Sequence, residues 1–184
     1  MPKARISSST FARLLTLVAS LLLPLAAHAD EYAEVNRLLG SGSPAEALAR
    51  AERYLAGKPR DPQMRFLKAV VLAQTGRSAD AAAIYRALMQ DYPELPEPYN
   101  NLAVLYAGEQ QYGKAREALE MAIRAHPGYA TAHENLGDVY LQLARQSYGR
   151  AVQLDPASSS AQSKLAQSVP SSPTAPAPSL RSAP

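Results

Sequence analysis

The sequence predicts an all-α protein in which short helical hairpins stack into a solenoid. The first observation is a repeat, because Pro59, Pro93 and Pro127 are equally spaced along the chain and the same interval separates Ala81 from Ala115. The second is an apolar period of about 3.6 residues between these prolines, which is typical of amphipathic helices. The third is the size of the unit. A helix pair of about 34 residues cannot bury its own apolar face and must lean on a similar neighbour.

The clearest unit has two expected helices, from Pro98 to Gly108 and from Tyr112 to Arg124. Each carries one apolar stripe. Small residues at Ala103 and Ala115 let the two helices approach closely. Pro127 ends the second helix, because proline cannot continue a helix that has already formed. The unit is therefore expected to fold as a hairpin.

The residues between the helices agree with this interpretation. Gly42 and Gly76 lie one repeat apart and occupy the same place in successive turns. Ser43 and Glu46 have the spacing of a capping box, in which the serine side chain bonds the amide of the glutamate.

The clearest unit also resembles a known repeat. It is similar to the tetratricopeptide repeat in the order Tyr99, Asn100, Asn101, Leu102, Ala103, Tyr106, Tyr112, Ala115, Leu119, Ala122 and Pro127, with Tyr99 where that family usually has tryptophan. The resemblance covers about 30–156, in units at about 30–61, 62–95, 96–129 and 130–156. It implies a right-handed α-solenoid of tetratricopeptide-type hairpins.

The last unit departs from the pattern. Gly137 and Tyr140 keep the phase of the repeat. The counterparts of Ala115, Ala122 and Pro127 arrive five residues early, at Ala144, Ala151 and Pro156. The turn is therefore deleted, and we expect one long helix over 131–154 to close the stack. A tight kink near Arg145 and Gln146 is the alternative.

The N-terminal residues have the pattern of a secretory signal. Three cations, Lys3, Arg5 and Arg13, precede an apolar stretch over 14–25 and the small residues at 27–29. We expect residues 1–29 to be removed before Asp30 and the product to reach the periplasm without stable membrane insertion. The alternative is an uncleaved anchor, but the apolar stretch is shorter than the roughly 20 residues that span a bilayer.

The C-terminal residues 157–184 are rich in Ser, Pro and Ala and hold almost no large apolar side chain. Such a segment cannot bury enough surface to offset its ordering entropy, so a disordered tail is expected. We favour a spacer over the alternative, in which Pro173 and Pro176 form part of a ligand for a groove on another protein.

Composition argues against several classes of function. Lys3, Arg5 and Arg13 account for the net charge of +3, so the remainder is balanced and shows no signature of nucleic-acid binding. The chain has no cysteine, which excludes disulfides and thiolate metal sites. His126 and His133 are interpreted as helix-end or packing residues and not as metal ligands. No catalytic constellation stands out, so we expect neither an enzyme nor a bound cofactor.

The resemblance implies a concave groove, lined by the first helix of each hairpin, that holds a segment of a partner. Asn101 and Asn135, one repeat apart, are expected to project into it and to bond a peptide backbone through their amides. The alternative is that they bond neighbouring backbone. The expected groove residues are Tyr32, Asn36, Phe66, Val70, Tyr99, Asn100, Asn101, Val104, Glu134, Asn135 and Asp138. No cation is among them, which argues against a clamp for a partner's carboxylates.

These features predict a non-catalytic adaptor of the cell envelope that binds another envelope protein or peptide segment. The alternative is a structural or self-assembling scaffold that stacks through the ends of the array. A monomer is favoured for the adaptor.

Overall fold

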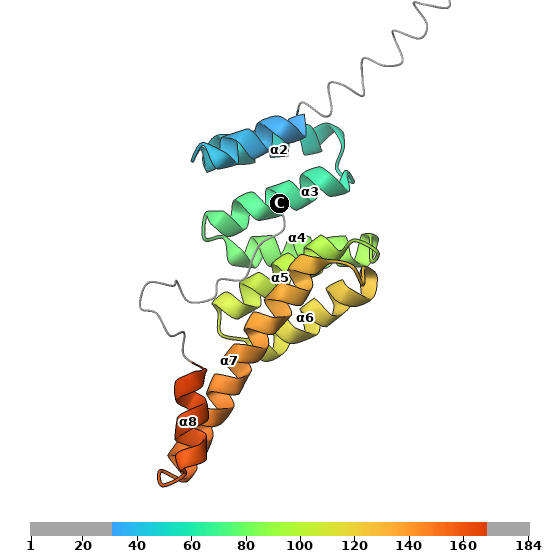
Figure 1. Cartoon of the computed structure of the whole chain (residues 1–184). Coiled ribbons are helices and arrows are strands. Elements are labelled where there is room, and N and C mark those ends of the chain that lie inside the picture. The colour runs from blue at the N-terminus through green and yellow to red at the C-terminus, as the bar shows by residue number, and fades with distance from the viewer. Residues whose placement is uncertain (1–30, 169–184) are drawn as a thin grey trace, which may run out of the picture. The chain divides into compact units, whose positions relative to one another are not determined.

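The computed structural model describes residues 31–168, and within that range the chain forms helices and turns with no strand (Figure 1). Residues 31–40 form the first described helix. The others are α2 (Pro44–Gly57), α3 (Pro62–Gln74), α4 (Ser78–Asp91), α5 (Pro96–Gly108), α6 (Tyr112–Ala125), α7 (Ala130–Leu154) and α8 (Ser159–Gln167). The predicted all-α class is confirmed. The predicted signal and residues 169–184 of the predicted tail lie outside the described residues.

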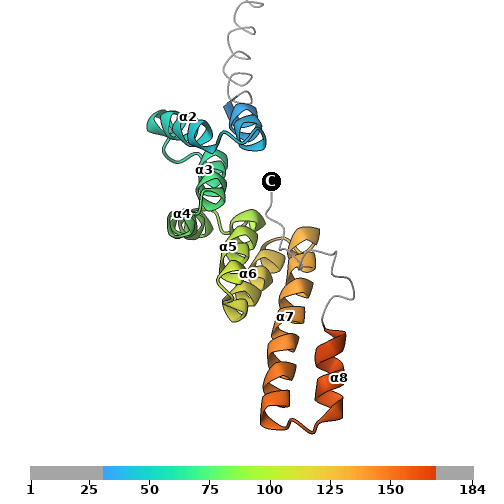
Figure 2. The same ribbon diagram turned by 90° about the vertical axis from the view of Figure 1, so that its left-hand side faces the viewer.

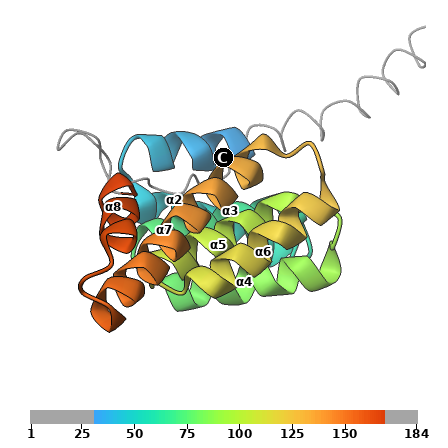
Figure 3. The same ribbon diagram turned by 60° about the horizontal axis from the view of Figure 1, so that its bottom comes forward.

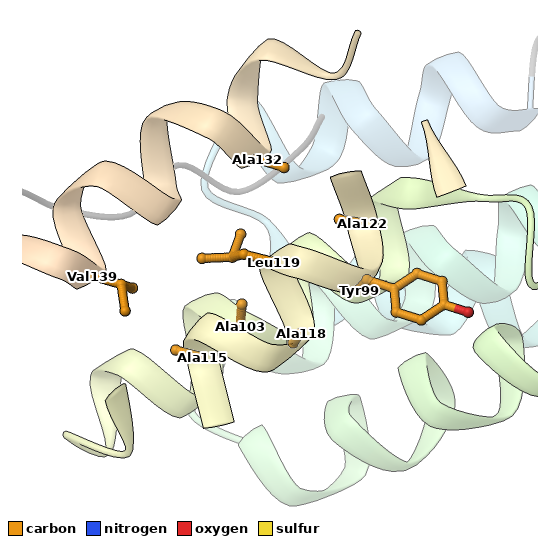
Figure 4. Close-up of a cluster of buried hydrophobic side chains, with 8 residues drawn as sticks. All are labelled: Tyr99, Ala103, Ala115, Ala118, Leu119, Ala122, Ala132 and Val139. Atoms are coloured by element: carbon orange, nitrogen blue, oxygen red, sulfur yellow. The ribbon is translucent and has the colours of Figure 1, made fainter. Parts of the chain in front are cut away.

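The described chain divides into two compact units, 31–71 and 72–168, with the boundary inside α3. The core of the first unit consists of Val35, Leu38, Ala47, Ala51, Met64, Leu67 and Val71. The main cluster of the second consists of Tyr99, Ala103, Ala115, Ala118, Leu119, Ala122, Ala132 and Val139 (Figure 4). The first core contains two alanines and the second contains five, and such small side chains let neighbouring helices pack closely.

The turn inside each of the first three hairpins contains one residue in the left-handed conformation, and these residues keep the repeat. They are Gly42 (φ 76°), Gly76 (φ 78°) and Gln110 (φ 59°), each one repeat after the last. In each turn the following N–H donates to a carbonyl five residues earlier: Ser43 to Leu38 (2.9 Å), Arg77 to Leu72 (2.9 Å) and Gln111 to Tyr106 (2.8 Å). This is the hydrogen bond of a Schellman motif, which satisfies a carbonyl at the end of the helix.

The capping box predicted at Ser43 and Glu46 is wrong. Ser43 precedes α2, but its side chain makes no capping hydrogen bond. The turn holds Ser43 at φ −108° and ψ 58°, outside the extended conformation from which a capping side chain reaches the next amides. Only its carbonyl serves the helix, accepting from the N–H of Ala47 at 3.1 Å.

The long helix predicted for the last unit is confirmed as α7, which runs for 25 residues without a break at Arg145 or Gln146. Tyr140 and Ala144 are the counterparts of Tyr106 and Ala115, so three residues stand where the earlier unit has eight, and the left-handed position is lost inside the helix. Because no residue reverses the chain at this point, the two halves of the unit form one rod.

Part of the predicted disordered tail is helical, so that prediction is wrong for 159–167. Figures 2 and 3 show α8 running back beside the C-terminal half of α7. Ser158 caps it, accepting from the N–H of Ala161 at 3.3 Å, and Ala161 is buried. The Lys164 ammonium lies 5.8 Å from the centre of the Tyr148 ring on α7. A short polar segment can therefore form an ordered helix when a neighbouring helix, here α7, provides the surface on which it packs.

Replacing Gln110 by glycine is expected to stabilise the protein by about 1 kcal/mol. A residue other than glycine costs about 1–2 kcal/mol in the left-handed conformation, and the added freedom of glycine in the unfolded chain offsets part of the gain. Urea unfolding measures the change. Gln111→Gly is the control, because Gln111 has a φ of −84° and gains nothing from glycine. A Gln110→Gly protein no more stable than the parent would contradict the strain at this turn.

Candidate functional site

A chain of buried side-chain hydrogen bonds links three helices of the second unit. Asn135 on α7 donates from Nδ2 to Oδ1 of Asn100 on α5 at 2.7 Å. Asn100 donates from Nδ2 to Oδ1 of its neighbour Asn101 at 3.1 Å. Asn101 in turn donates from Nδ2 to the hydroxyl of Tyr85 on α4 at 3.3 Å. The chain therefore ties α7 to α5 and α5 to α4.

All four side chains in this network are buried. A buried amide without partners costs about 1–3 kcal/mol, so the mutual bonds make the burial tolerable and fix the amide positions. Burial raises the pKa of Tyr85 to about 12, although the bond from Asn101 opposes the rise. The phenol is therefore neutral at physiological pH. The hydrogen bonds described here join side chains. Contact of Asn101 and Asn135 with a ligand stays a prediction.

Three further predicted groove residues lie on the same two helices. Val104, one turn after Asn101 on α5, is half-buried. Glu134 on α7 is exposed, and Asp138, one turn later, is half-buried. Residues three or four apart lie on one side of a helix, so the two carboxylates mark one side of α7. The side chains that accompany the amide network thus include one apolar group and two acids.

Tyr99, another predicted groove residue, lies in the core. It belongs to the main core cluster of the second unit, together with Ala103 and Leu119 (Figure 4), and is only 4% exposed. Its hydroxyl reaches the core's edge and donates to the carbonyl of Pro93 at 3.3 Å. The signal for a core position was present, since Ala103 follows at helical spacing.

The remaining predicted groove residues belong to the first unit. Tyr32 donates from its hydroxyl to Oδ2 of Asp61 at 2.6 Å and lies 3.0 Å from the hydroxyl of Tyr54. Burial and this bond to Asp61 hold the pKa of Tyr32 above its ordinary value. Asn36 is exposed, Phe66 is buried and Val70 is half-buried.

Sequence reasoning missed Asp61. Its Oδ1 accepts from the N–H of Met64 at 2.8 Å, and its Oδ2 also accepts from the hydroxyl of Tyr54 at 3.2 Å. An aspartate directly before the proline that opens α3 was the available signal, because Asp is favoured at the start of a helix.

The two histidines of the described chain are His126 and His133. A ring nitrogen of His133 lies 2.9 Å from the carbonyl of Pro127, and His126 meets the ring of Tyr129 edge-on. Among residues 31–168, no group of three His, Cys, Asp or Glu side chains has the arrangement of a metal site. In the same part of the chain, no helix is long and apolar enough to cross a membrane.

Comparison with known proteins gives similarities over most of the described chain. A family model described as "Tetratricopeptide repeat" matches residues 32–96 and 100–159. A tetratricopeptide repeat domain-containing protein, PYG7, chloroplastic, of Arabidopsis thaliana is 31% identical over 129 residues, covering 60% of this chain and 43% of the relative. The probable biofilm formation methyltransferase WspC of Pseudomonas aeruginosa is 29% identical over 101 residues, covering 55% of this chain and 24% of the relative. The chain thus spans less than half the length of these relatives.

Solved structures show the same fold. MamA from Desulfovibrio magneticus RS-1 is similar with a TM-score of 0.55 and 25% identity, covering 76% of this chain and 82% of that one. The structure titled Naa15/Naa10 bound to HypK-THB contains a chain similar with a TM-score of 0.56 and 19% identity, covering 76% of this chain and 22% of that one.

The family match and the structural neighbours agree with the evenly spaced turns and the stacked hairpins. This fold is that of a protein–protein interaction scaffold. The chain belongs to the tetratricopeptide repeat family.

Proposed function

We propose that this chain is a non-catalytic adaptor of the cell envelope, which binds a segment of another envelope protein on the face formed by α5 and α7. The observation that carries the proposal is the bond of 2.7 Å between Asn135 and Asn100. It joins the first helices of two consecutive units, so that α5 and α7 act as one rigid support. A rigid surface loses little conformational entropy when a partner binds.

The chemistry of this face favours an extended or helical segment that carries basic residues. Glu134 and Asp138 supply negative charge on α7, and Val104 supplies apolar contact on α5. Opposite charges across an interface raise the association rate and discriminate against acidic segments. In this mechanism the protein binds the partner segment on a rigid surface, and no covalent bond is made or broken.

The relatives with enzymatic names are consistent with a non-catalytic role for the repeats. WspC is matched over 24% of its length, and the protein O-mannosyl-transferase TMTC1 of Mus musculus over 12%. The similarity is therefore confined to a minor part of each, and the family match accounts for it as repeats. The predicted secretory signal over 1–29 supports an envelope location.

A photo-reactive amino acid placed at Val104 is expected to crosslink to an envelope protein in living cells. Val104 is half-buried on α5, one turn after Asn101. The proposal places the partner segment over this position. The matched control replaces Glu117, which is exposed on α6 outside this face. Adducts are identified by mass spectrometry of the purified chain. Equal crosslinking from both positions, or adducts from position 117 alone, would remove α5 and α7 as the binding face.

The mature protein is expected to begin at Asp30. Mass spectrometry of the chain purified from an envelope fraction measures its N-terminus, and a variant with Ala27 and Ala29 changed to large residues serves as the control, because signal cleavage needs small residues there. A chain that keeps Met1 and stays in the cytoplasm would contradict the envelope assignment.

A further inference from the structure

The last repeat lacks the packing that closes the repeat before it. In the earlier repeat, Ala103 on α5 and Ala115 on α6 are both fully buried in the main cluster (Figure 4). Their counterparts are Gly137 and Ala144, which both lie on α7. Gly137 is exposed and Ala144 is half-buried. A helix cannot fold back on itself without a turn, so these two positions cannot meet within one chain.

The middle of α7 carries two large apolar side chains in the same region. Tyr140 is 48% exposed and Leu141 is 49% exposed. Tyr106, the counterpart of Tyr140, packs instead against the main core cluster. The neighbouring α8 lies along the C-terminal half of α7 (Figure 2), where Lys164 contacts Tyr148. The side chains of Tyr140 and Leu141 stay exposed beside it.

We propose that a second copy of this chain supplies the missing packing. The α7 helices of two copies lie antiparallel, so that residues 130–140 of each copy pack against residues 141–151 of the other. Each copy thereby receives the second helix of its last hairpin from its neighbour. Such an arrangement has two-fold symmetry and closes on itself, as most homodimers do.

The register of this dimer follows from the repeat. If Gly137 and Ala144 take the places of Ala103 and Ala115, then Gly137 of one copy lies against Ala144 of the second copy. The two-fold axis then passes midway between these positions, between Tyr140 and Leu141. Those are the two large apolar residues that the single chain leaves exposed in the middle of α7. Repeat spacing and surface exposure are independent observations, and both place the two-fold axis of the dimer between Tyr140 and Leu141.

Charge along α7 favours the same orientation. Its first half carries Glu134 and Asp138, whereas its second half carries Arg145 and Arg150. An antiparallel pair brings acids of one copy towards arginines of the other, and a parallel pair would bring like charges together. The dimer departs from the monomer favoured by the sequence. It uses Glu134 and Asp138, as the proposed binding face does, but its packing and register are argued from Gly137, Tyr140, Leu141 and Ala144.

The register can be tested with cysteines, because the chain has none of its own. Positions 137 and 144 are separated by about 10 Å along one helix, beyond the Cα distance of about 7 Å that a disulfide can bridge. In the full chain, Gly137→Cys with Ala144→Cys is expected to form a covalent dimer under mild oxidation, seen on a non-reducing gel. Each single substitution is the matched control and stays uncrosslinked. In the antiparallel pair, position 137 of one copy and position 137 of the other are also offset by about 10 Å along the helices, and the same holds for position 144.

Light scattering coupled to gel filtration measures the mass of the unmodified chain over a dilution series. The expected mass is twice that of one chain. Tyr140→Glu with Leu141→Glu is expected to halve it while circular dichroism is unchanged, since both side chains are exposed. A single-chain mass at every concentration, a dimer that survives the double substitution, failure of the cysteine pair to crosslink, or crosslinking of a single cysteine variant would each overturn the proposal.

Discussion

One backbone constraint organises this protein: a residue in the left-handed conformation at the hairpin turn. Gly42, Gly76 and Gln110 reverse the chain, each one repeat after the last. Each reversal lets the following N–H satisfy a carbonyl at the end of the first helix, and it aims the second helix back along the first. Because these turns share one geometry, small residues such as Ala103 and Ala115 meet in the core. Where the left-handed residue is missing, between Tyr140 and Ala144, the chain continues as the long helix α7.

The interior of the second unit uses this regularity in two ways. Fully buried alanines allow neighbouring helices to pack closely, and the amides of Asn100, Asn101 and Asn135 hydrogen-bond one another between α5 and α7. Alanine contacts alone are non-directional, whereas paired amides specify one alignment of the helices. The network therefore gives the packing of α5 against α7 a defined geometry.

The fold class and the continuous α7 could be predicted because they depend on periodic spacing, which the sequence displays directly. The left-handed Gln110 could be located only by its phase, since glutamine has no intrinsic preference for that conformation. The helix α8 could not be predicted from composition, because its order comes from packing against α7 and from the Ser158 cap. Contact of Asn101 and Asn135 with a ligand stays a prediction. Their hydrogen bonding through Asn100 depends on how α5 and α7 are positioned, which residue type does not reveal. Tyr99 was assigned to the surface although its spacing from Ala103 fits the core.

The central claim is that the missing turn alone makes the last repeat a single helix. Spin labels at Glu134→Cys and Ser147→Cys measure this directly by electron paramagnetic resonance, with labelled chains diluted into unlabelled ones. In a continuous helix, the two positions are about 20 Å apart along the axis. A variant with five residues, including a glycine for the left-handed position, inserted between Leu143 and Ala144 should bring them to about 10 Å, the spacing of packed helices. A short distance in the parent chain, or a long one in the variant, would contradict the claim.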